Sequence, residues 1–136
     1  MRKIDSAELD TWRFFFQGRP EVAAVYLFGS YGTEFQHPQS DIDLGIVFAH
    51  LVNMSEELTL DAELSLYLHH DRIDLVNLDR APIVLQYRAL AEGLLVYEGD
   101  YLKNSDFIEH VNKYYPDYAI KYKMMAKDYE AAVKEG

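Results

Sequence analysis

Cysteine is the first absence in this chain of 136 residues, which contains none. Disulfide bonds, thiol catalysis and thiolate zinc sites are therefore excluded, and any bound metal ion must be held by carboxylates or imidazoles. Positive charge is also scarce, because 13 Lys and Arg residues face 23 Asp and Glu residues and give a formal net charge of −10. Binding to a nucleic-acid backbone needs clustered positive charge, so we expect no direct nucleic-acid partner.

Long hydrophobic runs are absent as well. No stretch approaches the roughly 18 consecutive apolar residues of a membrane span, and the opening segment turns acidic at Asp5 before any signal-peptide run develops. We therefore expect a cytoplasmic protein without membrane contact. Hydrophobic residues still make up 49% of the chain and aromatic residues 14%, which is enough for one buried core and argues against disorder.

The spacing of apolar residues predicts elements in the order α-β-β-α-β-α-β, followed by a helical tail. The predicted strands cover residues 22–28, 41–48, 72–78 and 94–97, and the predicted helices cover residues 6–18, 55–69 and 81–93. Asp5 or Ser6 is expected to cap the first helix and Ser55 the next one, where Leu58 leaves the capping box incomplete. This order indicates an α/β (α+β) fold, with a small mixed sheet flanked by helices.

Charge divides the chain into two parts. Residues 1–100 hold 7 basic and 17 acidic residues, which accounts for the whole net charge, whereas residues 101–136 hold 6 of each. We therefore predict a core over residues 1–100 and a C-terminal helical extension over residues 101–136. Aromatic and apolar residues recur along this extension at steps of three or four, and Pro116 is expected to start a second helix in it. This row of aromatic and apolar residues is consistent with packing of the extension either on the core or on a partner.

Two carboxylates stand close together at the start of the second predicted strand. Asp41 and Asp43 are two positions apart, so both side chains project from one face of the strand. Like charges at this separation repel, and Asp is disfavoured in strands, unless a cation lies between the two groups. Mg²⁺ prefers such oxygen ligands, although two unrelated solvated acids would produce the same pattern.

Two further features bear on the same interpretation. Asp74 lies within an apolar run of the third predicted strand, and it can share a metal site if this strand pairs with the second one. An ion pair with Arg72 or His70 at a sheet edge is the alternative. The first strand ends in Gly29-Ser30, where a glycine turn lets a phosphate approach main-chain N–H groups and a serine adds a hydroxyl donor.

Gly29-Ser30, a spacer of ten residues and then Asp41-x-Asp43 resemble the signature of the polymerase-beta nucleotidyltransferase superfamily. The most similar group is the minimal nucleotidyltransferase (MNT) family, and within it the MntA-type antitoxins of HEPN/MNT toxin–antitoxin pairs. The segments 40–44, 74–82 and 91–98 also resemble this family, so the likeness covers residues 22–100. It implies the nucleotidyltransferase fold.

The resemblance also implies a function. Members of this group transfer AMP from ATP to a tyrosine hydroxyl of a HEPN ribonuclease toxin and so neutralise it. Gly29 and Ser30 would hold the triphosphate. Asp41 and Asp43 would bind two Mg²⁺ ions, and Asp74 would supply the third metal ligand and activate the hydroxyl. The cognate toxin would be the partner in a hetero-oligomer.

One departure from the family pattern and two other functions remain open. Family members often carry an arginine soon after the Gly-Ser pair, whereas Tyr31 is followed here by Gly32-Thr33-Glu34. Metal ions, with Arg80 or Arg88, would then neutralise the triphosphate. The alternatives are a non-catalytic antitoxin that acts by binding alone and an antibiotic-modifying nucleotidyltransferase. The 36 residues after the core leave little room for the substrate-binding structure that the latter usually needs.

Overall fold

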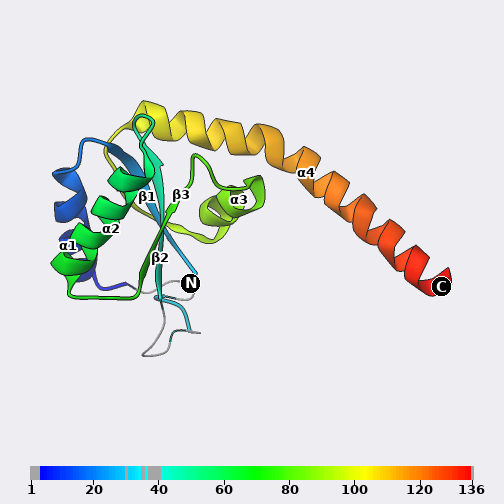
Figure 1. Ribbon diagram of the computed structural model, residues 1–136, viewed down its shortest axis with the longest axis horizontal. Helices are drawn as coiled ribbons and strands as arrows, with labels where there is room; N and C mark the ends of the chain where they lie inside the picture. Colours follow the sequence, from blue (N-terminus) through cyan, green and yellow to red (C-terminus); the bar gives the residue numbers. More distant parts are fainter. Residues whose placement is uncertain (1–3, 30, 35, 37–40, 136) are drawn as a thin grey trace.

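A mixed four-stranded sheet runs through the molecule in the order β3-β2-β1-β4 (Figure 1). The computed structural model describes residues 4–29, 31–34, 36 and 41–135. The strands are β1 (Val22–Phe28), β2 (Ile42–Phe48), β3 (Ile73–Asn77) and β4 (Leu94–Glu98). β1 is antiparallel to both β2 and β4, whereas β2 and β3 are parallel. The predicted order of elements and the predicted fold class are confirmed.

Helices cover both faces of the sheet. α1 (Ser6–Gln17) and α2 (Met54–Leu68) lie on one face, and α3 (Ile83–Glu92) and the first part of α4 (Tyr101–Glu135) lie on the other. On the first face, Trp12 and Leu64 pack against β2 side chains such as Leu44. On the second face, Phe107 and Val111 of α4 are buried against the sheet. Burial of these apolar side chains is the main force that holds the three layers together.

The residue that caps α2 differs from the sequence prediction, whereas the cap of α1 agrees with it. Asp5 caps α1 as expected, because its side chain accepts a hydrogen bond from the Ala7 amide. At α2, however, the cap is Asn53 and not Ser55. The Asn53 side chain accepts from the Glu56 amide at 2.8 Å, and Glu56 Oε1 accepts from the Asn53 amide at 3.3 Å, so the capping box is complete. Asparagine is as good a cap as serine, so residue preference alone could not place the boundary.

The C-terminal helix is the second correction. Pro116 lies inside α4 and does not start a new helix. The first part of α4 is anchored to the sheet through Asn104, which is fully buried. Its amide oxygen accepts a 2.6 Å hydrogen bond from the Tyr26 hydroxyl, and its amide nitrogen donates to Glu98 at 2.6 Å. Beyond Pro116 the helix projects away from the sheet and its covering helices (Figure 1).

The described part of the chain contains no helix that is both long enough and apolar enough to cross a membrane. α4 is the longest helix, but its polar and charged residues alternate with its apolar ones throughout.

Candidate active site

The two acid-bearing strands begin at the same end of the sheet, because β2 and β3 are parallel. Asp43 and Asp74 are paired residues in the register of these strands, so their backbones lie one strand spacing apart, about 4.8 Å. Alternation places both on the sheet face that α3 and α4 cover, since Leu44 and Leu75, the residues after them, pack toward α1 and α2. We call this end, where β2 and β3 begin, the acidic end of the sheet.

Gly29 brings the first strand into the same place. β1 is antiparallel to β2, so it ends where β2 begins, and Phe28 pairs with Asp43. Gly29 follows directly with a φ of +79°, a conformation that side chains rarely adopt. A Cβ atom added to Gly29 would overlap Asp43 Oδ2 and lie only 3.1 Å from Asp43 Cγ. The Asp43 carboxylate therefore lies directly over the glycine backbone, and it would have to move if any other residue stood at this position.

The remaining predicted site residues are placed less closely. Asp41 is exposed and lies one residue before β2, at the same end of the sheet. Ser30 lies outside the described residues, so its predicted role in triphosphate binding rests on the sequence alone. The structure thus brings Gly29, Asp43 and Asp74 together and leaves Asp41 at the margin of this group.

The donor chemistry of this end of the sheet fits a hard divalent cation. Carboxylate oxygens are the ligands that Mg²⁺ prefers, and Mg²⁺ is usually held by one or two carboxylates together with substrate phosphates. Within the described ranges, no three His, Cys, Asp or Glu side chains are drawn together as a ready-made metal site. Asp41, Asp43 and Asp74 are all among the described residues, so these three acids do not form such a site on their own.

A fourth carboxylate, which belongs to α2 on the other face of the sheet but interacts electrostatically with Asp74, was not identified from the sequence. Asp61 of α2 is partly buried, and its pKa is raised above the usual value, first by burial and then by the negative charge of Asp74, while a hydrogen bond from Ser65 opposes the shift. Nothing in the sequence distinguishes Asp61 from other acids of the helix. Its interaction with Asp74 becomes visible only when the packing of α2 against β3 is known. Its effect is to add negative potential beside Asp74.

Tyr31 ties the turn after β1 to the first helix. Its hydroxyl donates a hydrogen bond to the Glu8 carboxylate of α1, and its ring lies 5.9 Å from the Trp12 ring, measured between centroids. Burial, followed by the nearby Glu8 carboxylate, raises the pKa of Tyr31 well above its usual value. The hydroxyl therefore stays protonated and keeps donating to Glu8. Two contacts from α1 thus fix the residue that lies two positions after Gly29.

The two arginines suggested for charge neutralisation lie in different places. Arg80, which follows β3 in the chain, forms an ion pair with Glu57 of α2. It therefore lies at the opposite end of the sheet from Asp74. Arg88 belongs to α3, whose C-terminal residue is followed by Gly93 beside the Leu27 carbonyl of β1. Of these two arginines, only Arg88 belongs to an element that reaches the acidic end.

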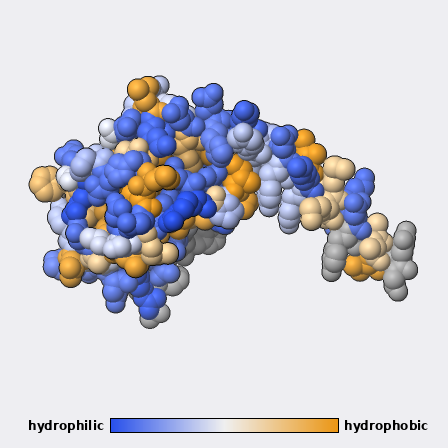
Figure 2. Space-filling view, turned by 45° about the horizontal axis from the view of Figure 1, so that its top comes forward, coloured by the Kyte–Doolittle hydropathy of each residue, from blue (hydrophilic) through white to orange (hydrophobic). Residues whose placement is uncertain are grey.

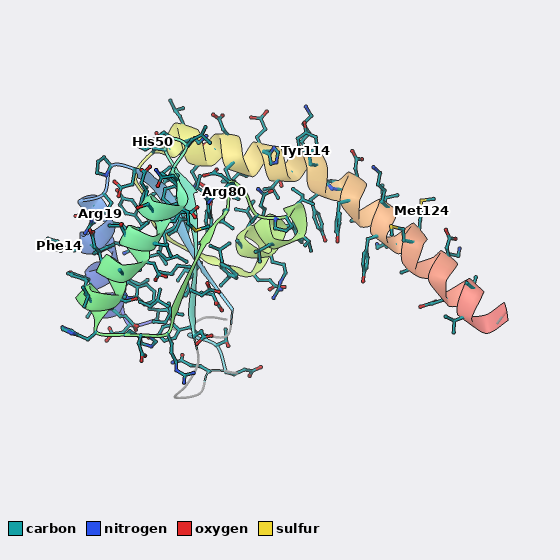
Figure 3. All side chains as sticks on the ribbon, viewed as in Figure 1. Phe14, Arg19, His50, Arg80, Tyr114 and Met124 are labelled. Carbon is teal, nitrogen blue, oxygen red and sulfur yellow. The ribbon has the colours of Figure 1, made fainter. Side chains whose placement is uncertain are left out.

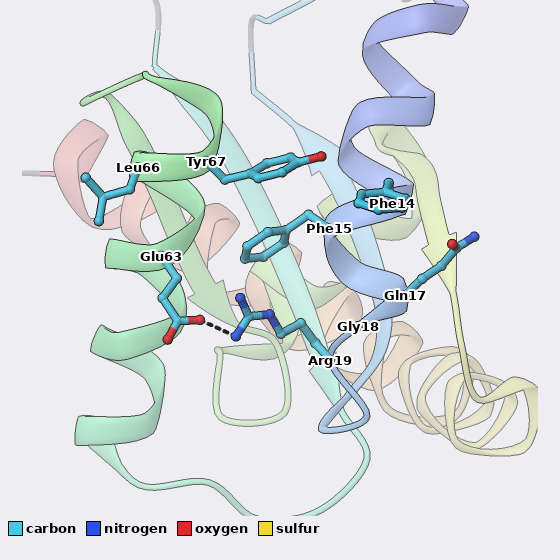
Figure 4. A pocket seen from close by; sticks show the side chains of 8 residues that line it. All are labelled: Phe14, Phe15, Gln17, Gly18, Arg19, Glu63, Leu66 and Tyr67. Carbon is cyan, nitrogen blue, oxygen red and sulfur yellow. Dashed lines mark ion pairs between the residues drawn. The ribbon is translucent and has the colours of Figure 1, made fainter.

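A groove of the described surface lies elsewhere. It has a volume of about 770 Å³ and lies between the end of α1 and α2 (Figure 4). Phe14, Phe15 and Tyr67 line it, and Arg19 is already paired with Glu63 and placed 4.5 Å above the Phe15 ring. The helices that form the groove cover the sheet face opposite to the acids. Because the groove is separated from the acids by the sheet, we do not assign it as the candidate active site despite its volume.

The arrangement of Gly29, Asp43 and Asp74 on a small mixed sheet agrees with the comparison with known families. The profile of the family described as polymerase beta, nucleotidyltransferase, matches residues 13–102, which is about two thirds of the chain. This chain therefore belongs to the polymerase-beta nucleotidyltransferase family. The matched region contains every predicted site residue.

Similarity to one characterised protein is more specific but partial. The protein adenylyltransferase MntA of Shewanella oneidensis is 35% identical over 74 residues, which cover 54% of this chain and 52% of MntA. The matched part thus spans about half the length of that relative.

Solved structures share the fold over nearly the whole chain. A toxin–antitoxin structure with AMP-PNP superposes with a TM-score of 0.74 at 24% identity, covering 90% of this chain and 98% of the other. A complex of a tri-AMPylated Shewanella oneidensis HEPN toxin with its MNT antitoxin gives a TM-score of 0.71 at 21% identity, covering 93% and 99%. At these identities the likeness establishes the fold alone.

Proposed function

We propose that this chain is the antitoxin of a HEPN/MNT toxin–antitoxin pair and transfers AMP from ATP to a tyrosine hydroxyl of its HEPN ribonuclease toxin. The observation that carries the proposal is the pairing of Asp43 with Asp74 beside Gly29, inside the region that matches the nucleotidyltransferase family. The relatives support it, because one is a protein adenylyltransferase and another structure contains an AMPylated HEPN toxin.

The turn after β1 binds the triphosphate in this mechanism. Gly29 has a positive φ, a conformation found in turns whose main-chain N–H groups bind anions, and Ser30 would add a hydroxyl donor. Asp41, Asp43 and Asp74 would hold two Mg²⁺ ions, which would supply positive charge to neutralise the phosphates and the pyrophosphate leaving group. Tyr31, fixed by Glu8, keeps this turn in position.

Asp74 acts on the acceptor. Its carboxylate accepts the proton of the tyrosine hydroxyl as the phenolic oxygen forms a bond to the α-phosphorus of ATP. The bond from that phosphorus to the bridging oxygen of the β-phosphate breaks, and pyrophosphate leaves. Tyrosine suits this chemistry because its ordinary pKa, near 10, is far below that of an aliphatic hydroxyl. The product is a phosphodiester between AMP and the toxin.

Charge and organisation fit such a partner. A ribonuclease must bind RNA phosphates and therefore needs a positively charged surface, which the net charge of −10 on residues 1–100 would attract. We assign residues 1–100 to the catalytic core and residues 101–136 to a helical extension whose first part packs on that core. Both ATP and a ribonuclease toxin place the reaction in the cytoplasm.

Mass spectrometry of the toxin tests the proposal. After incubation with this chain, ATP and Mg²⁺, the toxin should gain the mass of one or more AMP units and lose its ribonuclease activity. The double variant Asp41→Asn with Asp43→Asn should abolish the gain while it stays folded. Asp10→Asn is the matched control, because Asp10 is an exposed acid on α1 with only a 3.8 Å contact to Arg13. It should behave as the parent chain.

Two outcomes would overturn the proposal. Toxin that is inhibited without any change of mass would identify a non-catalytic antitoxin. An unchanged rate in the double variant would show that the acidic end of the sheet is not the transfer site.

A further inference from the structure

The part of α4 that follows Pro116 carries several exposed apolar side chains, and of its described side chains only Tyr118 near its start lies beside a ring of the preceding part, that of Tyr115. We call residues 117–135 the arm. At 1.5 Å per residue it is about 28 Å long. Figure 1 shows it extending beyond the rest of the molecule, and hydrophobic residues continue along it in Figure 2. Tyr122 and Met125 are 61% and 70% exposed, values more typical of surface lysines than of a tyrosine and a methionine.

These side chains continue the face of α4 that is buried in the first half of the helix. With 100° between successive residues, Tyr118, Tyr122 and Met125 fall within roughly 40° of the buried residues Phe107 and Val111. We call Tyr118, Tyr122 and Met125 the arm stripe. The face that packs on the sheet therefore runs on past the edge of the molecule, and the same kind of contact is left unfilled there.

The spacing of the stripe suits a helix as the occupant. Its residues follow one another at four and then three positions, the alternation by which side chains of one helix fit between those of another. Ala119 and Ala126 lie beside the stripe, and their small side chains let a second helix approach closely. Tyrosine and methionine are also among the residues enriched at the centre of protein interfaces.

Resting on the function proposed above, we propose that the arm stripe docks an α-helix of the HEPN toxin. Charge favours this occupant over a second copy of the chain. Two copies would bring together two cores that each carry −10, whereas the toxin needs a positive surface for RNA and is attracted to that core. The extension itself has six charges of each sign, so it adds no repulsion toward a cationic partner.

The arm offers a matched control on its other side. Ile120 and Met124 are 58% and 61% exposed, which is similar to the stripe residues. They lie roughly 165° and 125° around the helix from the centre of the stripe. In Figure 3, Met124 projects from the side of the arm that faces away from α3. Met124 and Met125 are therefore neighbours of the same type, with similar exposure, on different faces.

The experiment compares Tyr122→Glu and Met125→Glu with Ile120→Glu and Met124→Glu. Each full-length variant is mixed with the cognate HEPN toxin, whose ribonuclease site has been inactivated, and the dissociation constant is measured by calorimetry. The stripe variants should bind the toxin at least tenfold more weakly, and the control variants within twofold of the parent chain. Circular dichroism should show equal helix content in all four, because each site is exposed and glutamate favours helices.

The outcomes separate this inference from the proposed function. If the parent chain binds the toxin through the stripe but transfers no AMP, the docking surface stands and the enzymatic proposal fails. Equal binding by stripe and control variants, or no binding of the toxin by the parent chain, overturns the docking surface. It is also overturned if the chain alone is a dimer in light scattering that only the stripe variants dissociate, since the occupant is then a second copy.

Discussion

Replacing Gly29 with alanine tests the geometry of the acidic end most directly. The φ of +79° costs a residue with a Cβ atom about 1–2 kcal/mol, and the new atom overlaps the Asp43 carboxylate, which must turn away. A domain of ordinary stability, about 5–15 kcal/mol, tolerates this loss. We therefore expect a folded protein whose melting temperature falls by about 3–8 °C.

The effect on the reaction should be larger than the effect on stability. Displacement of a catalytic group by about 1 Å lowers rates by about 100-fold, which corresponds to roughly 2.7 kcal/mol of transition-state stabilisation. The assay is single-turnover AMP transfer to the toxin at saturating ATP, followed by mass spectrometry, with thermal unfolding measured on the same samples. The rate constant per folded molecule should drop by about two orders of magnitude.

Gly18→Ala is the matched control for this experiment. Gly18 ends α1 with an ordinary negative φ, and an added Cβ there would meet only the Phe15 carbonyl oxygen at 3.7 Å. Its rate constant should equal that of the parent chain. A Gly29→Ala protein that is folded and retains at least half of the parent rate would refute the view that the Asp43 carboxylate over Gly29 is part of the site.

Three further predictions concern single groups. Asp74→Asn should abolish transfer but leave the melting temperature unchanged or raised, because it removes the repulsion with Asp61; a large loss of stability would contradict this. Tyr26→Phe removes the hydrogen bond to the buried Asn104 and should lower the free energy of unfolding in urea by about 1–3 kcal/mol, whereas a neutral result would show that Asn104 finds another donor. The pKa of Tyr26 and that of Tyr31 are raised in the folded state, so their stabilising effect is complete below pH 10 and declines as the pH rises above it. Urea unfolding between pH 8 and 11.5 should show this decline, and it should be smaller in Tyr31→Phe; an identical slope in the variant would contradict the assignment.

Much of the fold follows from local patterns. The boundaries of the four strands were predictable to within one residue, because each is a short apolar run between turn residues. The register of β2 with β3 was not, since the sequence gives no direct sign of which strands pair. That register nevertheless decides the site, because it is what makes Asp74 the neighbour of Asp43.

The prediction failed at Pro116 for a physical reason. Proline removes one helical hydrogen bond and crowds the preceding turn, so it usually ends or bends a helix. In this chain Pro116 lies where α4 leaves the sheet, and the residues around it are largely exposed. The helix can bend there without disturbing the core, so it continues. Asp61 escaped prediction for a different reason, because its role depends on the packing of α2 against β3.

The acids of the candidate site contribute little to the fold that displays them. Asp41 and Asp74 are exposed, and the apolar cores on both faces of the sheet are built from other residues. An Asp-to-Asn change at either position needs only a single nucleotide substitution and leaves the scaffold intact. A lineage in which transfer no longer mattered would therefore lose its chemistry quickly and keep its shape, including the arm. Descendants of such a protein would be expected to survive as binding proteins with a nucleotidyltransferase fold.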